Sequence, residues 1–207
     1  MKKCILPLLA GILGTSLSQG AILFSELDIT NNKIELVNTG GSAVDMSGWW
    51  WCDLAGGGTA YAQMTAVSMV DSGLSSVGAS ISNFGAGQIL VLDIGENFLE
   101  DGFGELGLYN AASFSSPSAM EDYASWGGNG VRDSVAASKG IWVDNNPIDI
   151  SGLGVGDTVQ LSPGEDGNSA SAYLIGGGTL GGSNIPEPTV GLLSLIGLGF
   201  LARRRRA

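Results

Sequence analysis

The side chains of this 207-residue chain that could carry out chemistry are mainly carboxylates, and several are adjacent in the sequence. The adjacent pairs are Glu100-Asp101, Glu121-Asp122 and Glu165-Asp166. Glycoside hydrolysis needs two carboxylates about 5 to 9.5 Å apart across a cleft. Neighbouring residues on a strand face opposite ways, so an adjacent pair does not supply that arrangement. The chain also has no histidine, the commonest general base and metal ligand. We therefore expect no enzymatic activity, and a secreted hydrolase is the weakest alternative.

Oxygen-rich loops suggest a second kind of chemistry, the binding of calcium. Two groups qualify: Asp144-Asn145-Asn146 with Asp149, and Asp93 with Glu96 and Asn97. Carboxylate and amide oxygens on short loops are typical calcium ligands. Neither group has the spacing of a calcium-loop consensus, and solvated turns of this composition are common. We expect no cofactor, with calcium as the alternative.

The three consecutive tryptophans before Cys52 indicate a buried segment with one exposed ring. Side chains alternate along a strand, so the three rings cannot all point inward. We expect Trp49 to pack on the core, Trp50 to be partly exposed and Cys52 to be buried. An exposed indole could stack on a sugar or a partner, or it could cover a sheet edge, and both readings stay open.

The N-terminus has the pattern of a secretory signal peptide. Lys2-Lys3 forms a short basic region, and a mostly apolar run follows from Cys4 to Leu17. Small residues come next, which predicts cleavage between Gly20 and Ala21; cleavage after Ser18 and a retained N-terminal anchor are the alternatives. Because Cys4 leaves with the signal, the mature body has one cysteine and no internal disulfide.

The C-terminus combines three parts in a fixed order: Pro186-Glu187-Pro188, an apolar run from Thr189 to Ala202, and Arg203-Arg204-Arg205-Arg206. The prolines keep the first part extended and accessible. Clustered arginines after an apolar run stay on the cytoplasmic side, so the body would lie outside. As a helix the run spans roughly 21 Å, less than the roughly 30 Å of a bilayer core. We therefore expect a marginal, transient transmembrane anchor.

This tail resembles the PEP-CTERM sorting signal of Gram-negative, biofilm-forming bacteria, over residues 186–206. In that family a membrane protease-transpeptidase, exosortase, cuts at or near the Pro-Glu-Pro element and releases or transfers the body. The resemblance implies that Pro186, Glu187 and Pro188 are the recognition motif and that Arg203, Arg204, Arg205 and Arg206 are the cytoplasmic basic anchor. The apolar run is shorter than the family pattern.

Removal of both ends leaves a strongly acidic body. Residues 21–185 hold three basic and nineteen acidic residues, a formal net charge of −16. Such a surface disfavours nucleic acid and anionic lipid as partners and favours solubility. A length of 165 residues corresponds to one domain with a substantial core.

Short apolar-alternating segments separated by Gly, Asn, Asp and Ser turns predict an all-β sandwich. The expected strands are 21–28, 33–38, 43–46, 88–93, 104–109, 120–126, 141–143, 158–161 and 170–175. No stretch of the body shows a long helical period. Residues 68–87 predict a surface loop or an extra edge hairpin. Glu35 lies between Ile34 and Leu36, so it faces away from them, and we expect it on a solvated face.

The body resembles the lamin-tail domain, an immunoglobulin-like β-sandwich. The matching segments are 25–27, 34–38, 44–49, 87–92, 104–109 and 121–126, of which the first three are the most specific. The resemblance spans residues 21–162 and implies a non-catalytic interaction or structural module on a secreted or surface protein. Lys33 and the long 68–87 segment depart from the family pattern.

Together these patterns predict four segments: a signal peptide (1–20), a lamin-tail-like β-sandwich (21–175), a flexible Gly-rich linker (176–184) and a sorting signal with a transmembrane segment (185–207). We expect export, brief anchoring in the inner membrane, and delivery to the cell surface or extracellular matrix. The expected partners are signal peptidase, an exosortase-type enzyme, and extracellular polysaccharide or surface proteins. The expected role is structural or adhesive, and a carbohydrate- or calcium-binding module is the alternative.

Overall fold

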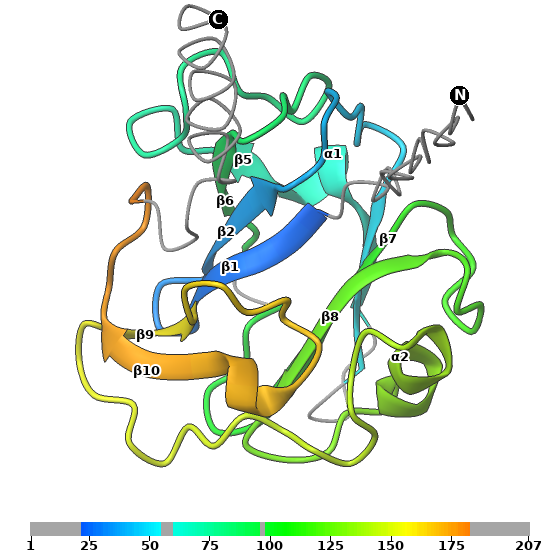
Figure 1. Cartoon of the computed structure of the whole chain (residues 1–207), viewed down its shortest axis with the longest axis vertical. Coiled ribbons are helices and arrows are strands. Elements are labelled where there is room, and N and C mark those ends of the chain that lie inside the picture. Colours follow the sequence, from blue (N-terminus) through cyan, green and yellow to red (C-terminus); the bar gives the residue numbers. More distant parts are fainter. Residues whose placement is uncertain (1–21, 55–59, 96–97, 183–207) are drawn as a thin grey trace, which may run out of the picture.

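A computed structural model describes residues 22–54, 60–95 and 98–182, and these residues form two packed antiparallel sheets (Figure 1). The first sheet has six strands in the order β10-β9-β1-β2-β6-β5. Its strands are β1 (Ile22–Asp28), β2 (Lys33–Asn38), β5 (Met69–Val70), β6 (Ile89–Asp93), β9 (Asp157–Leu161) and β10 (Tyr173–Gly177). The prediction of an all-β fold is confirmed at this level.

The second sheet has four strands in the order β4-β3-β7-β8. They are β3 (Trp50–Asp53), β4 (Ala60–Gln63), β7 (Gly104–Tyr109) and β8 (Met120–Trp126). Helical structure among the described residues is limited to short pieces: α1 (Met64–Val67), α2 (Asp133–Lys139) and a 3₁₀ turn, η2 (Ala170–Ala172). Helix α2 ends at Gly140, whose left-handed backbone (φ +83°) suits a residue without a side chain.

The core lies between the sheets and is built from alternate residues of their facing strands. The ring of Phe24 on β1 stacks on Trp51 of β3, with centroids 6.2 Å apart. Ile34 and Leu36 of β2 and Leu106 and Leu108 of β7 are fully buried in the same cluster. A polar tie crosses this core, because the backbone N–H of Phe24 donates to the Asp122 carboxylate at 2.6 Å. The two sheets are therefore fixed to each other by both rings and a buried hydrogen bond.

Most of the expected strands are present, several with the predicted bounds, and the differences have local causes. Residues 43–46 form only a bridge between Val44 and Phe84, and 141–143 form no strand because Ile141 caps the end of α2. Strands β3 and β4 and helix α2 were not predicted. The 68–87 segment contributes β5 to the sheet edge, in agreement with an extra edge element.

The alternation of side chains along a strand also explains how the tryptophans are placed. Trp50 is partly exposed, Cys52 is buried and Trp49 packs against the core, as predicted, while Trp51 is the fully buried ring. Trp49 is half-buried and packs against the edge of the core. The strand begins at Trp50, so Trp49 belongs to the preceding turn and escapes the strand alternation.

The position of Trp51 predicts a large loss of stability on truncation. Trp51→Ala should lower the free energy of unfolding by about 3 to 5 kcal/mol, because it removes a fully buried ring that stacks on Phe24. Urea denaturation measures the effect, with Trp50→Ala as the matched control expected to lose clearly less. Equal losses for both variants would contradict the assignment of Trp51 to the core.

Candidate functional site

The residues expected to direct sorting lie outside the described part of the chain. This applies to Gly20, to Ala21, to the Pro186-Glu187-Pro188 motif and to the arginines at 203–206. The structure does describe the chain up to Gly182, which is three residues short of Ile185 and four short of Pro186. The candidate sites described below therefore lie in the body and in the described residues that precede the motif.

Glu35 is fully buried, which corrects the prediction that it lies on a solvated face. It does face away from Ile34 and Leu36, but Glu26 of β1 lies directly opposite it and is equally buried. A β-bulge in β1 shifts the register between Phe24 and Glu26, so that Ser25 also reaches Glu35. The Ser25 hydroxyl donates to Glu35 Oε1 at 2.7 Å. The carboxylates of Glu26 and Glu35 therefore lie side by side, and both are shielded from solvent.

The segment that covers these two carboxylates consists of residues 178–182, and we call it the strap. The backbone N–H and the hydroxyl of Thr179 donate to the two carboxylate oxygens of Glu26, each at 2.7 Å. The backbone N–H of Gly181 donates to Glu35 Oε2 at 2.6 Å. Thr158 of β9 adds a donor to Glu26 at 2.7 Å. The strap is therefore bound to the outer face of the six-stranded sheet through the buried carboxylates.

The expected linker of residues 176–184 is corrected in its described part. Gly176 and Gly177 pair with β9 as the end of β10, and Gly178 donates its backbone N–H to Gly156 O at 3.0 Å. In Figure 1 this orange segment continues beyond β10 along the left side of the view. The Gly-rich composition suggested free chain, but here it permits close packing. A Cβ on Gly181 would lie 2.6 Å from the carbonyl oxygen of Leu74.

Burial governs the protonation of Glu35. Removal from water raises its pKa from 4.5 to about 7, against the lowering effect of the donors Ser25 and Gly181, and the Glu26 carboxylate raises it further. Burial also raises the pKa of Asp122 to about 7. A raised carboxyl pKa means that the folded protein holds the proton more tightly than the unfolded chain. The stability that these groups contribute is full below their ordinary pKa values, 4.5 for Glu35 and 3.8 for Asp122, and is lost as the pH rises through about 7.

The raised pKa of Glu35 predicts that the free energy of unfolding falls as the pH rises, and that Glu35→Gln reduces this dependence. A shift of this size corresponds to at most about 3 kcal/mol of the free energy of unfolding, lost between pH 4.5 and 7.5. Glutamine keeps the acceptor for Gly181 and cannot ionise. Urea denaturation across this pH range measures the slope, and Glu165→Gln at an exposed position is the control. A wild-type slope in Glu35→Gln would contradict the prediction.

A second buried polar cluster ties the 127–133 loop to the second sheet. The Tyr123 hydroxyl lies 2.6 Å from Glu105 Oε2 and 2.7 Å from Asp133 Oδ1. A phenol donates one proton, so one of these contacts needs a proton on a carboxyl group. Burial raises the pKa of Glu105, which favours that state. Beside this cluster, burial raises the pKa of Cys52 to about 12, so its thiol is unreactive at neutral pH.

A groove of about 590 Å³ opens where the ends of β1 and β2 approach the ends of β7 and β8; we call it the Trp49 groove. Its polar lining includes Asn110, Glu121 and Lys139, and Trp49 supplies the aromatic part. The Asn110 amide donates to Glu121 Oε1, and the Lys139 ammonium lies 3.7 Å from Glu121 Oε2. This arrangement can bind a ligand through an apolar ring face and hydrogen-bonding groups together. The unpredicted helix α2 places Lys139 there.

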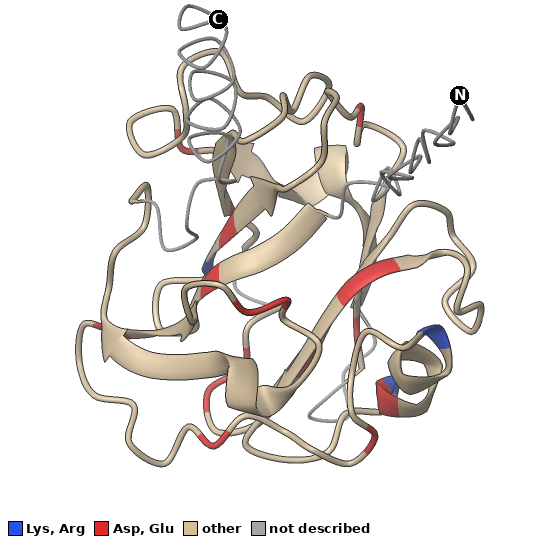
Figure 2. Cartoon of the chain, in the orientation of Figure 1, with Lys and Arg blue, Asp and Glu red and all other residues tan. Residues whose placement is uncertain are grey.

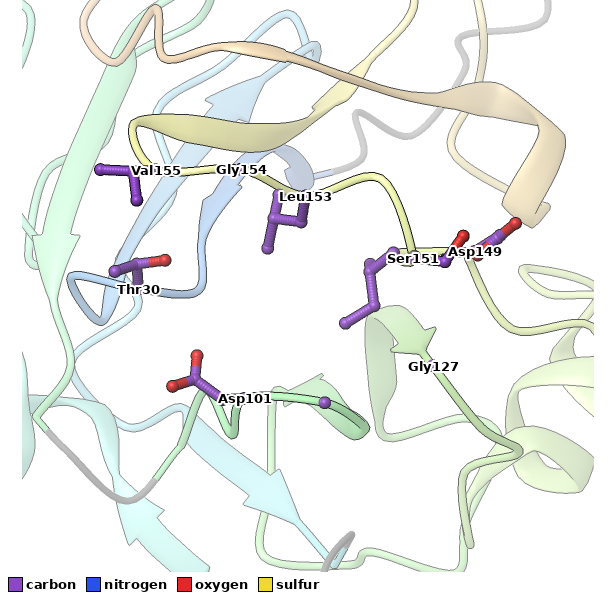
Figure 3. A pocket seen from close by; sticks show the side chains of 10 residues that line it. Thr30, Asp101, Gly127, Asp149, Ser151, Leu153, Gly154 and Val155 are labelled. Carbon is purple, nitrogen blue, oxygen red and sulfur yellow. Dashed lines mark hydrogen bonds between the residues drawn. The ribbon is translucent and has the colours of Figure 1, made fainter.

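A second cleft, of about 490 Å³, lies between the β1–β2 turn and the loops around residues 101 and 150. Figure 3 shows Thr30, Asp101 and Leu153 extending into it from different loops. Asp149, a ligand in the alternative calcium hypothesis, also lines it, but its carboxylate accepts the Ser151 backbone N–H at 2.9 Å. Groups of three or more Asp, Glu, Cys or His that could hold a metal are absent from the described residues, and Glu96 and Asn97 lie outside them.

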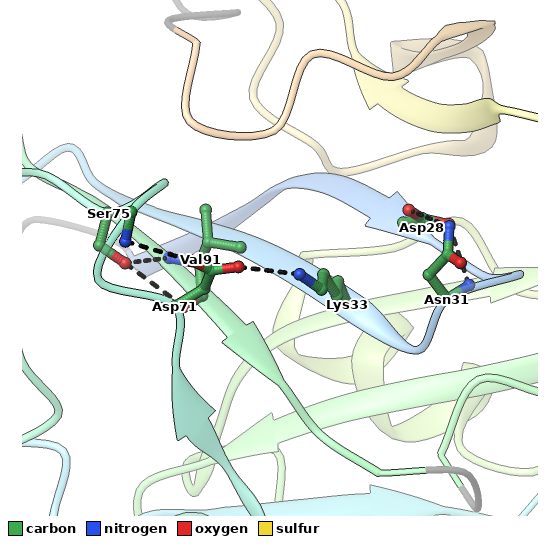
Figure 4. A network of polar contacts seen from close by, with 7 residues as sticks. Asp28, Asn31, Lys33, Asp71, Ser75 and Val91 are labelled. Carbon is green, nitrogen blue, oxygen red and sulfur yellow. Dashed lines mark hydrogen bonds and ion pairs between the residues drawn. The ribbon is translucent and has the colours of Figure 1, made fainter.

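The few basic residues of the body are engaged at separate places. Lys33 begins β2, whereas Arg132 and Lys139 lie at the two ends of α2; Figure 2 colours the basic residues blue. Lys33 forms an ion pair with Asp71 at 2.8 Å, and this fixes the 71–75 turn against the edge of the first sheet (Figure 4). Arg132 donates to Tyr61 and Ser115. The acidic residues far outnumber these cations, so most of the surface repels anions.

Comparisons of the chain with protein-family models, with curated proteins and with solved structures find no match. Among the residues that the structure describes, no helix is both long and apolar enough to cross a membrane.

The packing of the strap predicts which glycine of the run is essential. Gly181 has a left-handed backbone (φ +82°) and no room for a Cβ, whereas a Cβ on Gly177 would meet nothing within 4 Å. Gly181→Ala should release the strap, increase proteolysis within residues 178–182 and speed amide exchange at Thr179. Gly177→Ala should resemble the wild type. Equal protection in both variants would show that the strap does not depend on this close approach.

Proposed function

We propose that the chain is an exported, non-catalytic structural or adhesive protein of the cell envelope or extracellular matrix. Its body would be an immunoglobulin-like sandwich similar to the lamin-tail domain. A signal peptide would direct export, and an exosortase-type enzyme would process the chain at Pro186-Glu187-Pro188. The two-sheet architecture and the tail sequence support this proposal.

The observation that carries the proposal is the bound strap. It fixes the end of the folded body to the outer face of the first sheet, through Glu26 and Glu35, immediately before the tail. A cut at or near Pro186 would therefore leave both sheets and the strap complete. A body that ends in a fixed segment before a separable tail suits a protein that is detached or transferred after folding.

Distance along the chain also supports a role for the strap in presentation of the motif. Four residue steps from Gly182 to Pro186 span at most about 14 Å. Without the strap, nine steps from Gly177 would span about 31 Å. In this proposal, release of the strap would extend the reach of the motif toward a membrane enzyme.

The buried carboxylates support a non-catalytic body. Glu26 and Glu35 are occupied by donors of the fold itself, and Asp122 accepts a backbone N–H in the core. The acidic surface supports partners without strong negative charge, and it opposes nucleic acid and anionic lipid.

The experiment that tests the proposal changes the motif alone. Replacement of Pro186-Glu187-Pro188 by three alanines should leave export and membrane insertion intact, because the apolar run and the arginines are unchanged. The full chain, tagged at an exposed position of the body, should then accumulate in the membrane fraction with its C-terminus uncut. Intact mass and a fractionation blot measure both results.

The matched control removes Arg203 to Arg206 instead. This variant should lose membrane retention, because positive charge no longer opposes complete translocation. The two variants must therefore fail in different ways. Release of the alanine variant with the wild-type C-terminus and yield would refute processing at the motif.

A further inference from the structure

We propose that the Trp49 groove binds a neutral polysaccharide, with a sugar ring against Trp49 and its hydroxyl groups on Asn110, Glu121 and Lys139. This inference rests on the proposed function, because it names the partner of the exported body. It concerns residues that the sorting signal does not use.

The shape of the groove suits a short stretch of glycan. Its volume of about 590 Å³ is within the range of small-molecule sites. Asn38 lines the groove and is held in place by two hydrogen bonds, since its buried side-chain amide donates to Ser42 O at 2.9 Å and to Phe84 O at 2.7 Å. A sugar ring has an apolar C–H face that packs on an indole, and Trp49 is half-buried with part of its surface in the groove.

The polar lining matches the other part of a sugar, its hydroxyl groups. Each hydroxyl both donates and accepts, so it needs donors and acceptors at close spacing. The Glu121 carboxylate accepts from Asn110 and lies beside the Lys139 ammonium, which donates to the Met120 carbonyl. An amide has two N–H groups and an ammonium three, so both keep donors for a ligand. The exposed hydroxyl of Ser118 adds a further partner at the rim.

The charges in and around the groove favour a neutral polysaccharide over an anionic one. Lys139 balances Glu121 inside the groove, so the lining carries no net charge from this pair. The surrounding body is strongly acidic, which repels an anionic polysaccharide. The cleft of Figure 3 differs, because Asp101 and Asp149 line it without a cation among its lining residues. Of the two hollows, the Trp49 groove alone combines an aromatic ring with balanced charge.

The experiment uses the protein purified from cells that express the full chain, from whichever fraction contains it. Neutral hexasaccharides of glucose, mannose, galactose, xylose and N-acetylglucosamine are titrated, with oligogalacturonate as the anionic comparison. Calorimetry measures affinity, and amide shifts in nuclear magnetic resonance spectra locate the contact. At least one neutral hexasaccharide should bind, and Trp49→Ala should weaken it about tenfold or more.

The matched control is Trp50→Ala, which removes the neighbouring tryptophan that does not line the groove and should keep wild-type affinity. Asn110→Ala and Glu121→Gln change groove residues at the surface, so they decide the question if Trp49→Ala does not fold; each should weaken binding severalfold. Failure of every neutral hexasaccharide to bind, a preference for oligogalacturonate, or loss in Trp50→Ala alone would overturn the inference. The proposed function is judged separately, by the location and C-terminal mass of the protein.

Discussion

The structure depends on the satisfaction of two carboxylates that are buried side by side. Glu26 and Glu35 face each other across β1 and β2, and both are fully buried. An unpaired buried charge costs several kcal/mol, so each oxygen needs a donor with good geometry. Ser25 and Thr158 supply donors from the sheet, and Thr179 and Gly181 supply donors from the strap. The bulge in β1 and the strap over the outer sheet face both bring donors to these carboxylates.

Buried hydrogen bonds between side chains and distant parts of the chain recur in this fold and help to specify one arrangement of its elements. The chain has 34 glycines, so its backbone loses much entropy on folding and its turns specify little by themselves. Asp122 fixes β8 to the bulged part of β1, and Tyr123 joins Glu105 of β7 to Asp133 of α2. Each tie connects elements that are distant in the sequence or belong to different layers. The result is a defined body despite short strands and long loops.

The same arrangement separates the two proposed roles in space. The strap ends at the outer face of the first sheet, next to the segment that leads to the tail. The Trp49 groove opens between the ends of the two sheets and involves α2 rather than the strap. A protein fixed or released at its C-terminus would therefore keep the groove accessible to a polymer. Processing and binding need not compete for the same surface.

The sequence by itself determined the local pattern: several strands with their bounds, the exposure of Trp50, the burial of Cys52 and the two-sheet class. These follow from side-chain alternation and turn residues, which act over a few residues. It also supplied the whole argument for the tail. Only the tertiary structure decided that Glu35 is buried, because its cover comes from residues 146 positions away. The sequence did not predict the strap, because a Gly-rich run has the same composition whether it is free or packed. The Trp49 groove depended likewise on α2, a short helix that tertiary contacts stabilise more than its own sequence does.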